Sequence, residues 1–163
     1  MKSTGEVMGI DEDLGLAYAK SQMAAQPPLP SGGNVFLSVK DSDKASLTKL
    51  ARELVDLGFD CFATSGTAAA LMNAGIKVNR LFKLAEGRPH VLDMMKNDQV
   101  HLIINTPSGK TPRNDEIRIR SLAVAQRIPT LTTISAVEAS IRAIRSHRTK
   151  GITVKSLQEY HGG

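Results

Sequence analysis

Hydrophobic residues recur along the chain with two different periods, which predict alternating helices and strands. Between residues 42 and 57 the apolar positions fall at Leu47, Leu50, Ala51, Leu54 and Val55, on one face of a helix. A short apolar run from residue 59 is typical of a strand inside a sheet. The other expected strands span 34–39, 78–84, 100–105 and 130–133, and the other expected helices span 11–24, 89–96, 115–127 and 135–147, with a short helix near Leu157. This alternation predicts an α/β fold with a roughly five-stranded, mainly parallel sheet covered by helices on both faces.

The stretch QPPLPSGG at residues 26–33 is the clearest boundary in the sequence. Its prolines and glycines remove backbone donors and favour an extended connector. We therefore predict three parts, with residues 1–25 as a tail of a preceding unit, 26–33 as a linker and 34–163 as one compact α/β domain.

The segment FDCFATSGTAAAL, residues 59–71, joins a predicted strand to a predicted helix through small residues. Gly66 permits a tight backbone path, and the hydroxyls of Thr64, Ser65 and Thr67 can donate hydrogen bonds. The free N–H groups at the start of the helix would point at the same place, which suits a phosphate group. A threonine or serine before an alanine-rich helix is also a common N-cap, so the sequence leaves both interpretations open.

Further polar residues follow the other predicted strands, at the edge where ligands bind in doubly wound sheets. Lys44 and Lys83 could place positive charge beside a phosphate, and Asn105 could bind a ribose hydroxyl. Thr132 follows the last strand at the same edge. Taken singly, such a lysine is usually solvated and such an asparagine is as often a turn residue.

Two other motifs carry weaker signals. Ser108, Gly109 and Lys110 resemble part of a phosphate loop, but the upstream glycine of a Walker motif is missing. Glu86 and His90 could form a catalytic pair, although a helix start with a proline in its first turn explains the same residues.

Composition narrows the range of partners. The formal net charge of +5 is compatible with anionic ligands, but the scarcity of aromatic residues argues against a stacking surface for nucleic acid. The single cysteine, Cys61, excludes an internal disulfide, and the histidines lack the spacing of metal ligands, so we expect no metal site. Because no apolar run reaches membrane-spanning length and the N-terminus lacks a signal-peptide core, we expect a cytoplasmic protein that does not contact a membrane.

Five segments, in this order and spacing, carry a resemblance to a known family: LSVKDSDK, FATSGTAAAL, KLAEGRPH, IINTPSG and TTISAVEA. They resemble the C-terminal regulatory domain of the large subunit of carbamoyl phosphate synthase, which has the methylglyoxal synthase-like, Rossmann-type three-layer fold. The leading KSTGEVMGI resembles the end of the preceding ATP-grasp synthetase half, in agreement with the predicted tail and linker. The resemblance covers nearly the whole chain.

The resemblance implies an allosteric domain that binds a nucleotide monophosphate effector such as UMP or IMP and has no synthase activity alone. Phosphate contacts would fall on Lys44, Thr64, Ser65, Gly66, Thr67 and Lys83, the ribose contact on Asn105, and part of an ornithine site on Thr132. Pro107 stands where relatives regulated by nucleotides can carry a hydroxyl residue, so the identity of the effector stays open.

For the complete enzyme, which serves pyrimidine and arginine biosynthesis, the resemblance implies ATP, Mg²⁺ or Mn²⁺ and a glutaminase small subunit. No cofactor is expected in this chain. One alternative is a phosphate-eliminating enzyme of the methylglyoxal synthase type, for which Asp41, Asp43 and Glu86 could supply a base. Another is a module through which large subunits form homo-oligomers.

Overall fold

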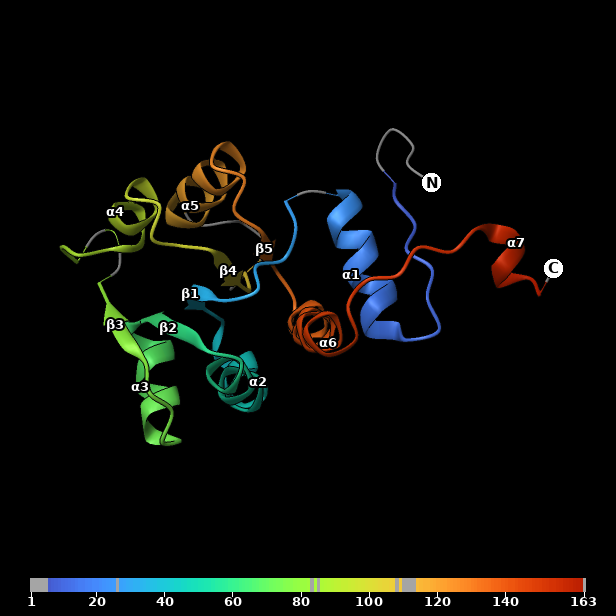
Figure 1. Ribbon diagram of the computed structural model, residues 1–163. Coiled ribbons are helices and arrows are strands. Elements are labelled where there is room, and N and C mark those ends of the chain that lie inside the picture. Colours follow the sequence, from blue (N-terminus) through green and yellow to red (C-terminus); the bar gives the residue numbers. More distant parts are fainter. Residues whose placement is uncertain are drawn as a thin grey trace.

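A computed structural model describes residues 6–25, 27–82, 84, 86–107, 109 and 114–162 of the chain (Figure 1). The strands are β1 (Gly33–Ser38), β2 (Phe59–Thr64), β3 (Asn79–Leu81), β4 (Leu102–Asn105) and β5 (Thr130–Leu131). The helices are α1 (Leu14–Ala25), α2 (Lys44–Asp56), α3 (Ser65–Asn73), α4 (Val91–Lys96), α5 (Asn114–Ala125), α6 (Ile134–Lys150) and α7 (Leu157–Tyr160), and a 3₁₀ turn, η1 (Asp41–Asp43), precedes α2.

The strands form one parallel sheet in the order β3-β2-β1-β4-β5, which confirms the predicted five-stranded α/β fold. The central strand is β1, which lies between β2 and β4. Ser38 at the end of β1 pairs with Asn105 at the end of β4, and Thr64 ends β2 beside Leu81. The carboxyl ends of the central strands therefore meet at one edge.

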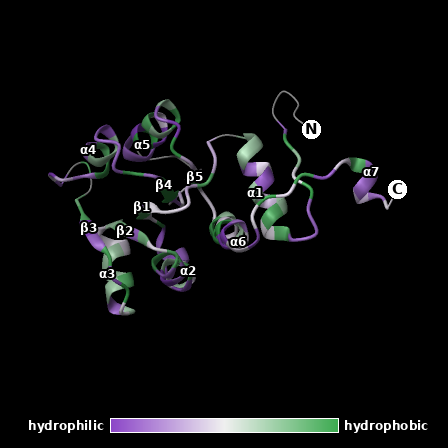
Figure 2. Cartoon of the chain, in the orientation of Figure 1, coloured by the Kyte–Doolittle hydropathy of each residue, from purple (hydrophilic) through white to green (hydrophobic). Residues whose placement is uncertain are grey.

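Helices cover both faces of the sheet (Figure 1). In β1 the alternation of side chains places Val35 and Leu37 in the core shared with α2, α3 and α6, whereas Phe36 faces the core shared with α4 and α5. The predicted apolar face of α2 is buried, with Leu54 fully covered. Figure 2 shows hydrophobic and hydrophilic residues interleaved along α6, as expected of a helix with one buried face.

The third strand is shorter than the predicted range 78–84. Beyond Leu81 the chain leaves β2, because the backbone N–H of Phe82 donates to Pro89 O (3.2 Å) instead. His90 then caps α4, with Nδ1 accepting from Asp93 N–H and Asp93 Oδ2 accepting from His90 N–H, at 3.3 Å each. The structure thus agrees with a helix start near residue 90, although α4 begins at Val91 and Pro89 precedes the N-cap instead of lying in the first turn.

The segment around α1 packs against α6, far from it in sequence (Figure 1). Leu16 and Ala19 of α1 are buried, and Gly15 lies so close to α6 that a Cβ atom there would be 2.8 Å from Arg142 O. Asp13 Oδ1 accepts from Ser146 Oγ (3.0 Å), and Asp13 Oδ2 pairs with Lys150 Nζ (2.5 Å). The predicted division at residues 26–33 stays a prediction. Within this chain, α1 packs against α6.

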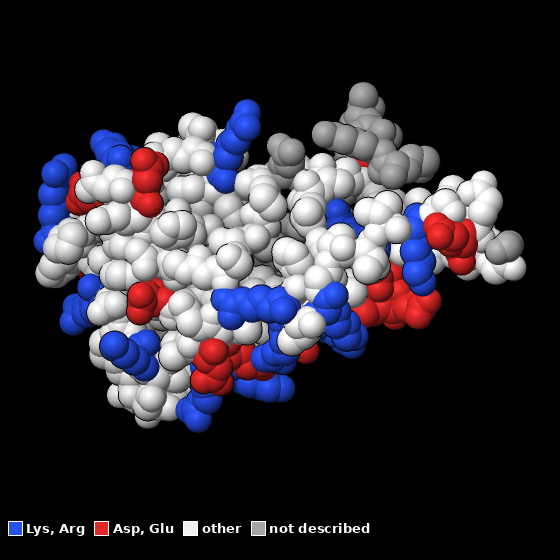
Figure 3. Space-filling view, viewed as in Figure 1, with Lys and Arg blue, Asp and Glu red and all other residues white. Residues whose placement is uncertain are grey.

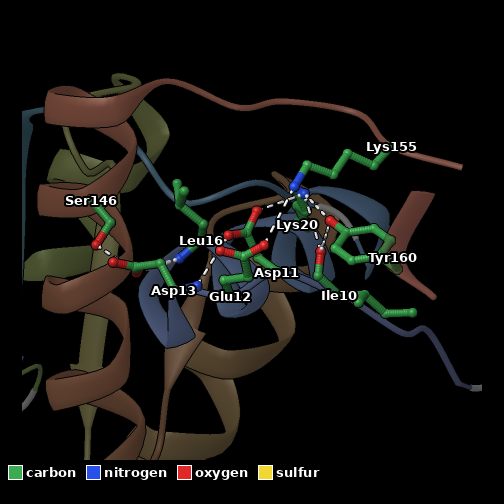
Figure 4. A network of polar contacts seen from close by, with 9 residues as sticks. All are labelled: Ile10, Asp11, Glu12, Asp13, Leu16, Lys20, Ser146, Lys155 and Tyr160. Atoms are coloured by element: carbon green, nitrogen blue, oxygen red, sulfur yellow. Dashed lines mark hydrogen bonds and ion pairs between the residues drawn. The ribbon is translucent and has the colours of Figure 1, made fainter. Parts of the chain in front are cut away.

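The end of the chain also lies against this segment (Figure 4). Tyr160 Oη in α7 donates to Ile10 O (2.8 Å) and accepts from Lys20 Nζ (3.1 Å), which also pairs with Asp11 Oδ2 (2.7 Å). Lys155 Nζ contacts Glu12 Oε1 (3.4 Å). Hydrogen bonds and an ion pair therefore join the first and last described segments.

Two surface properties complete the fold. Lysine and arginine side chains are scattered among acidic and neutral ones on the face seen in Figure 3. No helix in the described part of the chain is long and apolar enough to cross a membrane.

Candidate anion-binding site

A polar cavity of about 270 Å³ lies at the carboxyl ends of β1, β2 and β4. Its lining comprises Ser38, Val39, Lys40, Asp41, Lys44, Thr64, Gly66, Thr67, Asn105, Thr106 and Glu116. The structure thus brings together the predicted site residues Lys44, Thr64, Gly66, Thr67 and Asn105. They come from the ends of parallel strands and the helix starts that follow them, as the doubly wound topology requires.

The first turn of α3 presents its backbone N–H groups to this corner. Thr64, the N-cap residue, has an extended backbone (φ −64°, ψ 154°), and among the described residues no side chain caps the helix. By contrast, α6 is capped by Thr133, whose hydroxyl accepts from Ala136 N–H (3.2 Å). The Thr64 hydroxyl lies 3.4 Å from Ser38 Oγ instead. The N-terminal N–H groups of α3 are therefore available to an anion, which favours the phosphate interpretation over a simple N-cap.

Two buried hydroxyls in the cavity each accept one hydrogen bond from the backbone. Thr67 Oγ1 accepts from Val39 N–H (3.3 Å), and Thr106 Oγ1 accepts from Lys40 N–H (3.1 Å). The two threonines are only 2% and 3% exposed. Because a hydroxyl has one proton to donate, each of these groups can direct that proton to a ligand in the cavity. Such a set of donors fits an anion.

Lys44 supplies the positive charge of the corner. Its Nζ lies close to the first turn of α3, since a Cβ atom on Gly66 would be only 3.2 Å away from it. The same ammonium pairs with Asp41 Oδ1 at 2.6 Å. This hydrogen bond, together with the charge of Lys44, lowers the pKa of Asp41 below its ordinary value, so Asp41 is a carboxylate at neutral pH.

A second, mainly apolar cavity of about 90 Å³ adjoins the polar one. Its hydrophobic lining consists of Phe36, Phe82, Leu84, Val91 and Ile119. The two cavities share Ser38, Thr64, Asn105 and Glu116, and Asp115 lines the apolar one. A ligand with an anionic end and a flat apolar end could thus lie across both, with its middle beside the amide of Asn105.

Some predicted residues lie elsewhere. Ser65 does not line the cavity, and its hydroxyl accepts from Arg80 Nε (3.1 Å). Thr132 is exposed and lines a separate cavity of about 630 Å³ together with Arg120 and Arg127.

Lys83 lies outside the described residues, as do Ser108 and Lys110. Pro107 is described and exposed. Within the described ranges, no three His, Cys, Asp or Glu side chains come together as metal ligands.

Sequence reasoning missed the cavity residues Ser38, Thr106 and Glu116. Ser38 and Thr106 are polar residues at the ends of apolar strands, a signal that could have identified them. Glu116 gave no comparable signal. It lies in the first turn of α5, so its place in the cavity depends on where that helix packs on the sheet.

The comparisons with known proteins agree with this architecture. Residues 46–132 match the model of the MGS-like domain, and the chain belongs to this family. A crystal structure of methylglyoxal synthase from Elizabethkingia anophelis NUHP1 shares the fold, with a TM-score of 0.57 over 83% of this chain and 93% of that one. At 16% identity, this likeness concerns the fold alone.

The whole chain is also similar to part of much longer proteins. It is 50% identical over 163 residues to the carbamoyl phosphate synthase large chain of Acidobacterium capsulatum, and spans only 15% of that protein. It is 48% identical over 166 residues to the carbamoyl phosphate synthase large chain, C-terminal section, of Aquifex aeolicus, of which it covers 31%. The predicted resemblance to the C-terminal section of the large subunit is confirmed.

Proposed function

We propose that this chain is the regulatory section of a carbamoyl phosphate synthase large chain and binds a nucleotide monophosphate such as UMP or IMP. The observation that carries this proposal is the junction of the donor-lined polar cavity with the apolar cavity. The phosphate would bind the α3 N–H groups, Lys44 and the hydroxyls of Thr64 and Thr67, and the ribose would contact Asn105. The base would enter the apolar cavity. The sequence resemblance adds Lys83, which lies outside the described residues, to the proposed phosphate contacts.

In this proposal the chain performs no synthesis itself. Carbamoyl phosphate would form in the rest of the large chain, with ATP, Mg²⁺ or Mn²⁺ and ammonia from a glutaminase small subunit. Nucleotide binding would favour one conformation of the whole enzyme, because a ligand shifts an equilibrium only through different affinities for its two states. Thr132 would belong to a second effector site for ornithine, whose remaining residues lie outside this chain.

Calorimetric titration with UMP and IMP tests the nucleotide site. Substitution Lys44→Met should weaken binding about ten- to a hundredfold, as expected for the loss of a hydrogen bond between charged groups. Lys49→Met is the matched control, because Lys49 is exposed on the same helix and does not line the cavity. Absence of binding by both nucleotides to the unaltered chain would refute the proposal.

The carboxylates of Asp41 and Glu116 in the polar cavity favour a second candidate, a phosphate-eliminating enzyme. Elimination of phosphate requires a base beside the bound phosphate ester, and either residue could serve. Incubation of the chain with dihydroxyacetone phosphate, followed by an assay for methylglyoxal, decides between the two candidates. Product formation that is lost in Asp41→Asn or Glu116→Gln would establish the enzyme.

A further inference from the structure

We infer that Asp41 is a resident counter-ion of the anion site, which competes with a bound phosphate for Lys44. This inference rests on the proposed binding of phosphate at the start of α3. Asp41 lies in η1, one turn before Lys44, and its Oδ1 is 2.6 Å from Lys44 Nζ. Both residues line the polar cavity. The carboxylate thus occupies a position on the ammonium that a ligand oxygen would also seek.

The two partners of this ion pair differ in their freedom to move. The side chain of Lys44 is 25% exposed, whereas that of Asp41 is 94% exposed. The ammonium lies near Gly66, while the exposed carboxylate of Asp41 can turn into water. Exchange of Asp41 for a phosphate is therefore possible without rearrangement of the fold, because only an exposed ion pair has to open.

The exchange makes the site selective for phosphate over simple carboxylates. An acetate-like ligand offers Lys44 the same group that Asp41 already supplies at close range. A phosphate ester carries more charge and more oxygens, so it can bind Lys44 and the α3 N–H groups together. Asp41 thus acts as a built-in competitor, which disfavours monocarboxylates and lowers the affinity for phosphate.

Substitution Asp41→Asn removes the competitor and keeps the shape of the side chain. Binding of inorganic phosphate and of UMP should become about two- to fivefold tighter, in line with the strength of exposed ion pairs. Asp43→Asn is the matched control, since Asp43 lies in the same turn, pairs with Lys40 at 3.8 Å and does not line the cavity. Its affinity should stay close to that of the unaltered chain, because the carboxylate of Asp43 pairs with Lys40 and does not compete for the ammonium of Lys44.

Two further measurements separate direct exchange from a general effect of charge. Acetate should weaken phosphate binding in Asp41→Asn but hardly in the unaltered chain. In the Lys44→Met background, Asp41→Asn should no longer tighten binding, because the ammonium over which the two anions compete is gone. The shift of the Gly66 amide signal in NMR spectra reports phosphate binding in every variant, including those that bind weakly.

The outcomes are distinct. Unchanged or weaker phosphate binding in Asp41→Asn, or equal tightening in Asp43→Asn, would overturn the counter-ion role. Binding of inorganic phosphate without binding of UMP or IMP would overturn the proposed nucleotide function and still allow the exchange to be measured. Absence of binding by phosphate and by both nucleotides would overturn both.

Discussion

Lys44 and Gly66 meet so closely that a Cβ atom on residue 66 would lie 3.2 Å from the lysine Nζ. The lysine begins α2 and the glycine lies in the first turn of α3. Each helix follows a different strand of the sheet, so the sheet order fixes the contact between the ammonium and the N-terminal turn of α3. Because Gly66 has no side chain, the ammonium of Lys44 and the N-terminal N–H groups of α3 can face the same point.

The first prediction concerns Gly66→Ala. The added methyl group should displace the ammonium of Lys44 and obstruct approach to the α3 N–H groups, so UMP affinity should fall about tenfold. The free energy of unfolding should stay constant or rise slightly, because alanine favours helix more than glycine does. Calorimetry and urea unfolding measure the two effects.

Gly32→Ala provides the control for this substitution. A Cβ atom at residue 32 would have Arg148 Nη2 as its nearest neighbour, at 3.7 Å, which is an ordinary contact away from the cavity. Its UMP affinity should match that of the unaltered chain. Equal affinities of all three proteins would show that the start of α3 is not where the phosphate binds.

The second prediction concerns Thr67, which is 2% exposed and accepts the N–H of Val39. Thr67→Val keeps the shape but leaves that N–H without its acceptor, which should cost about 1–3 kcal/mol of unfolding free energy. It also removes a donor to the ligand, so UMP affinity should fall. Thr67→Ser keeps the hydroxyl and should retain most of the affinity, at about 1 kcal/mol for the lost methyl group. Equal loss of affinity in both variants would contradict the donor role.

Much of the fold and part of the site follow from local patterns. The apolar period of α2 and the small residues between β2 and α3 are local patterns, so the predicted helix within residues 42–57 and the predicted strand and helix within 59–71 are confirmed. Lys44 and Asn105, which the sequence predicts at one edge of the sheet, both line the polar cavity, because topology gathers the ends of parallel strands. The contacts between Lys44 and Asp41 and between Thr106 and Lys40 depend on side-chain orientation, which no periodicity specifies.

Contacts between distant segments were beyond the reach of sequence patterns. The proline-rich stretch after residue 25 predicts that residues 1–25 are a tail, and this division stays a prediction. The contact with α6 that buries Leu16 and Ala19 of α1 has no counterpart in the local pattern. Asp13 and Ser146 are 133 residues apart, and neither shows a local signal for the hydrogen bond between them. Thr132 follows a strand as expected but lines a different cavity, because β5 is the edge strand farthest from β2.

The third prediction concerns Cys61, which is 2% exposed in β2. Burial, and to a smaller extent the charge of Asp60, raises the pKa of the thiol to about 12. At pH 8 only about one thiol in ten thousand would be ionised, and a reagent could not reach it. Ellman's reagent should therefore react with the native protein only as fast as the protein opens, and within seconds in 6 M guanidinium chloride. Rapid reaction of the native protein would show that β2 is accessible.

The last prediction concerns the pH at which α1 separates from α6. Asp13 forms hydrogen bonds with Lys150, with the backbone N–H of Leu16 and with Ser146, and these lower the pKa of its carboxyl far below the ordinary value. A lowered pKa in the folded state means that the contact stabilises the protein above pH about 3.9 and weakens as the pH falls further. Acid should therefore release α1 from α6. The sheet should keep its structure, because no carboxylate is found among the described buried residues.

NMR spectra recorded from pH 6 down to pH 2 test this order of events, with the amide signals of α1 and β1 followed separately. Signals of α1 should shift at a higher pH than those of β1. Asp13→Asn, which keeps an acceptor but loses the charge, should remove the early acid step and leave α1 less protected from hydrogen exchange at neutral pH. Glu138→Gln, on the exposed side of α6, is the control and should leave the early step in place. If the α1 and β1 signals shifted together in all three proteins, the carboxylate of Asp13 would not be what holds α1 on α6, and apolar burial of Leu16 and Ala19 would suffice.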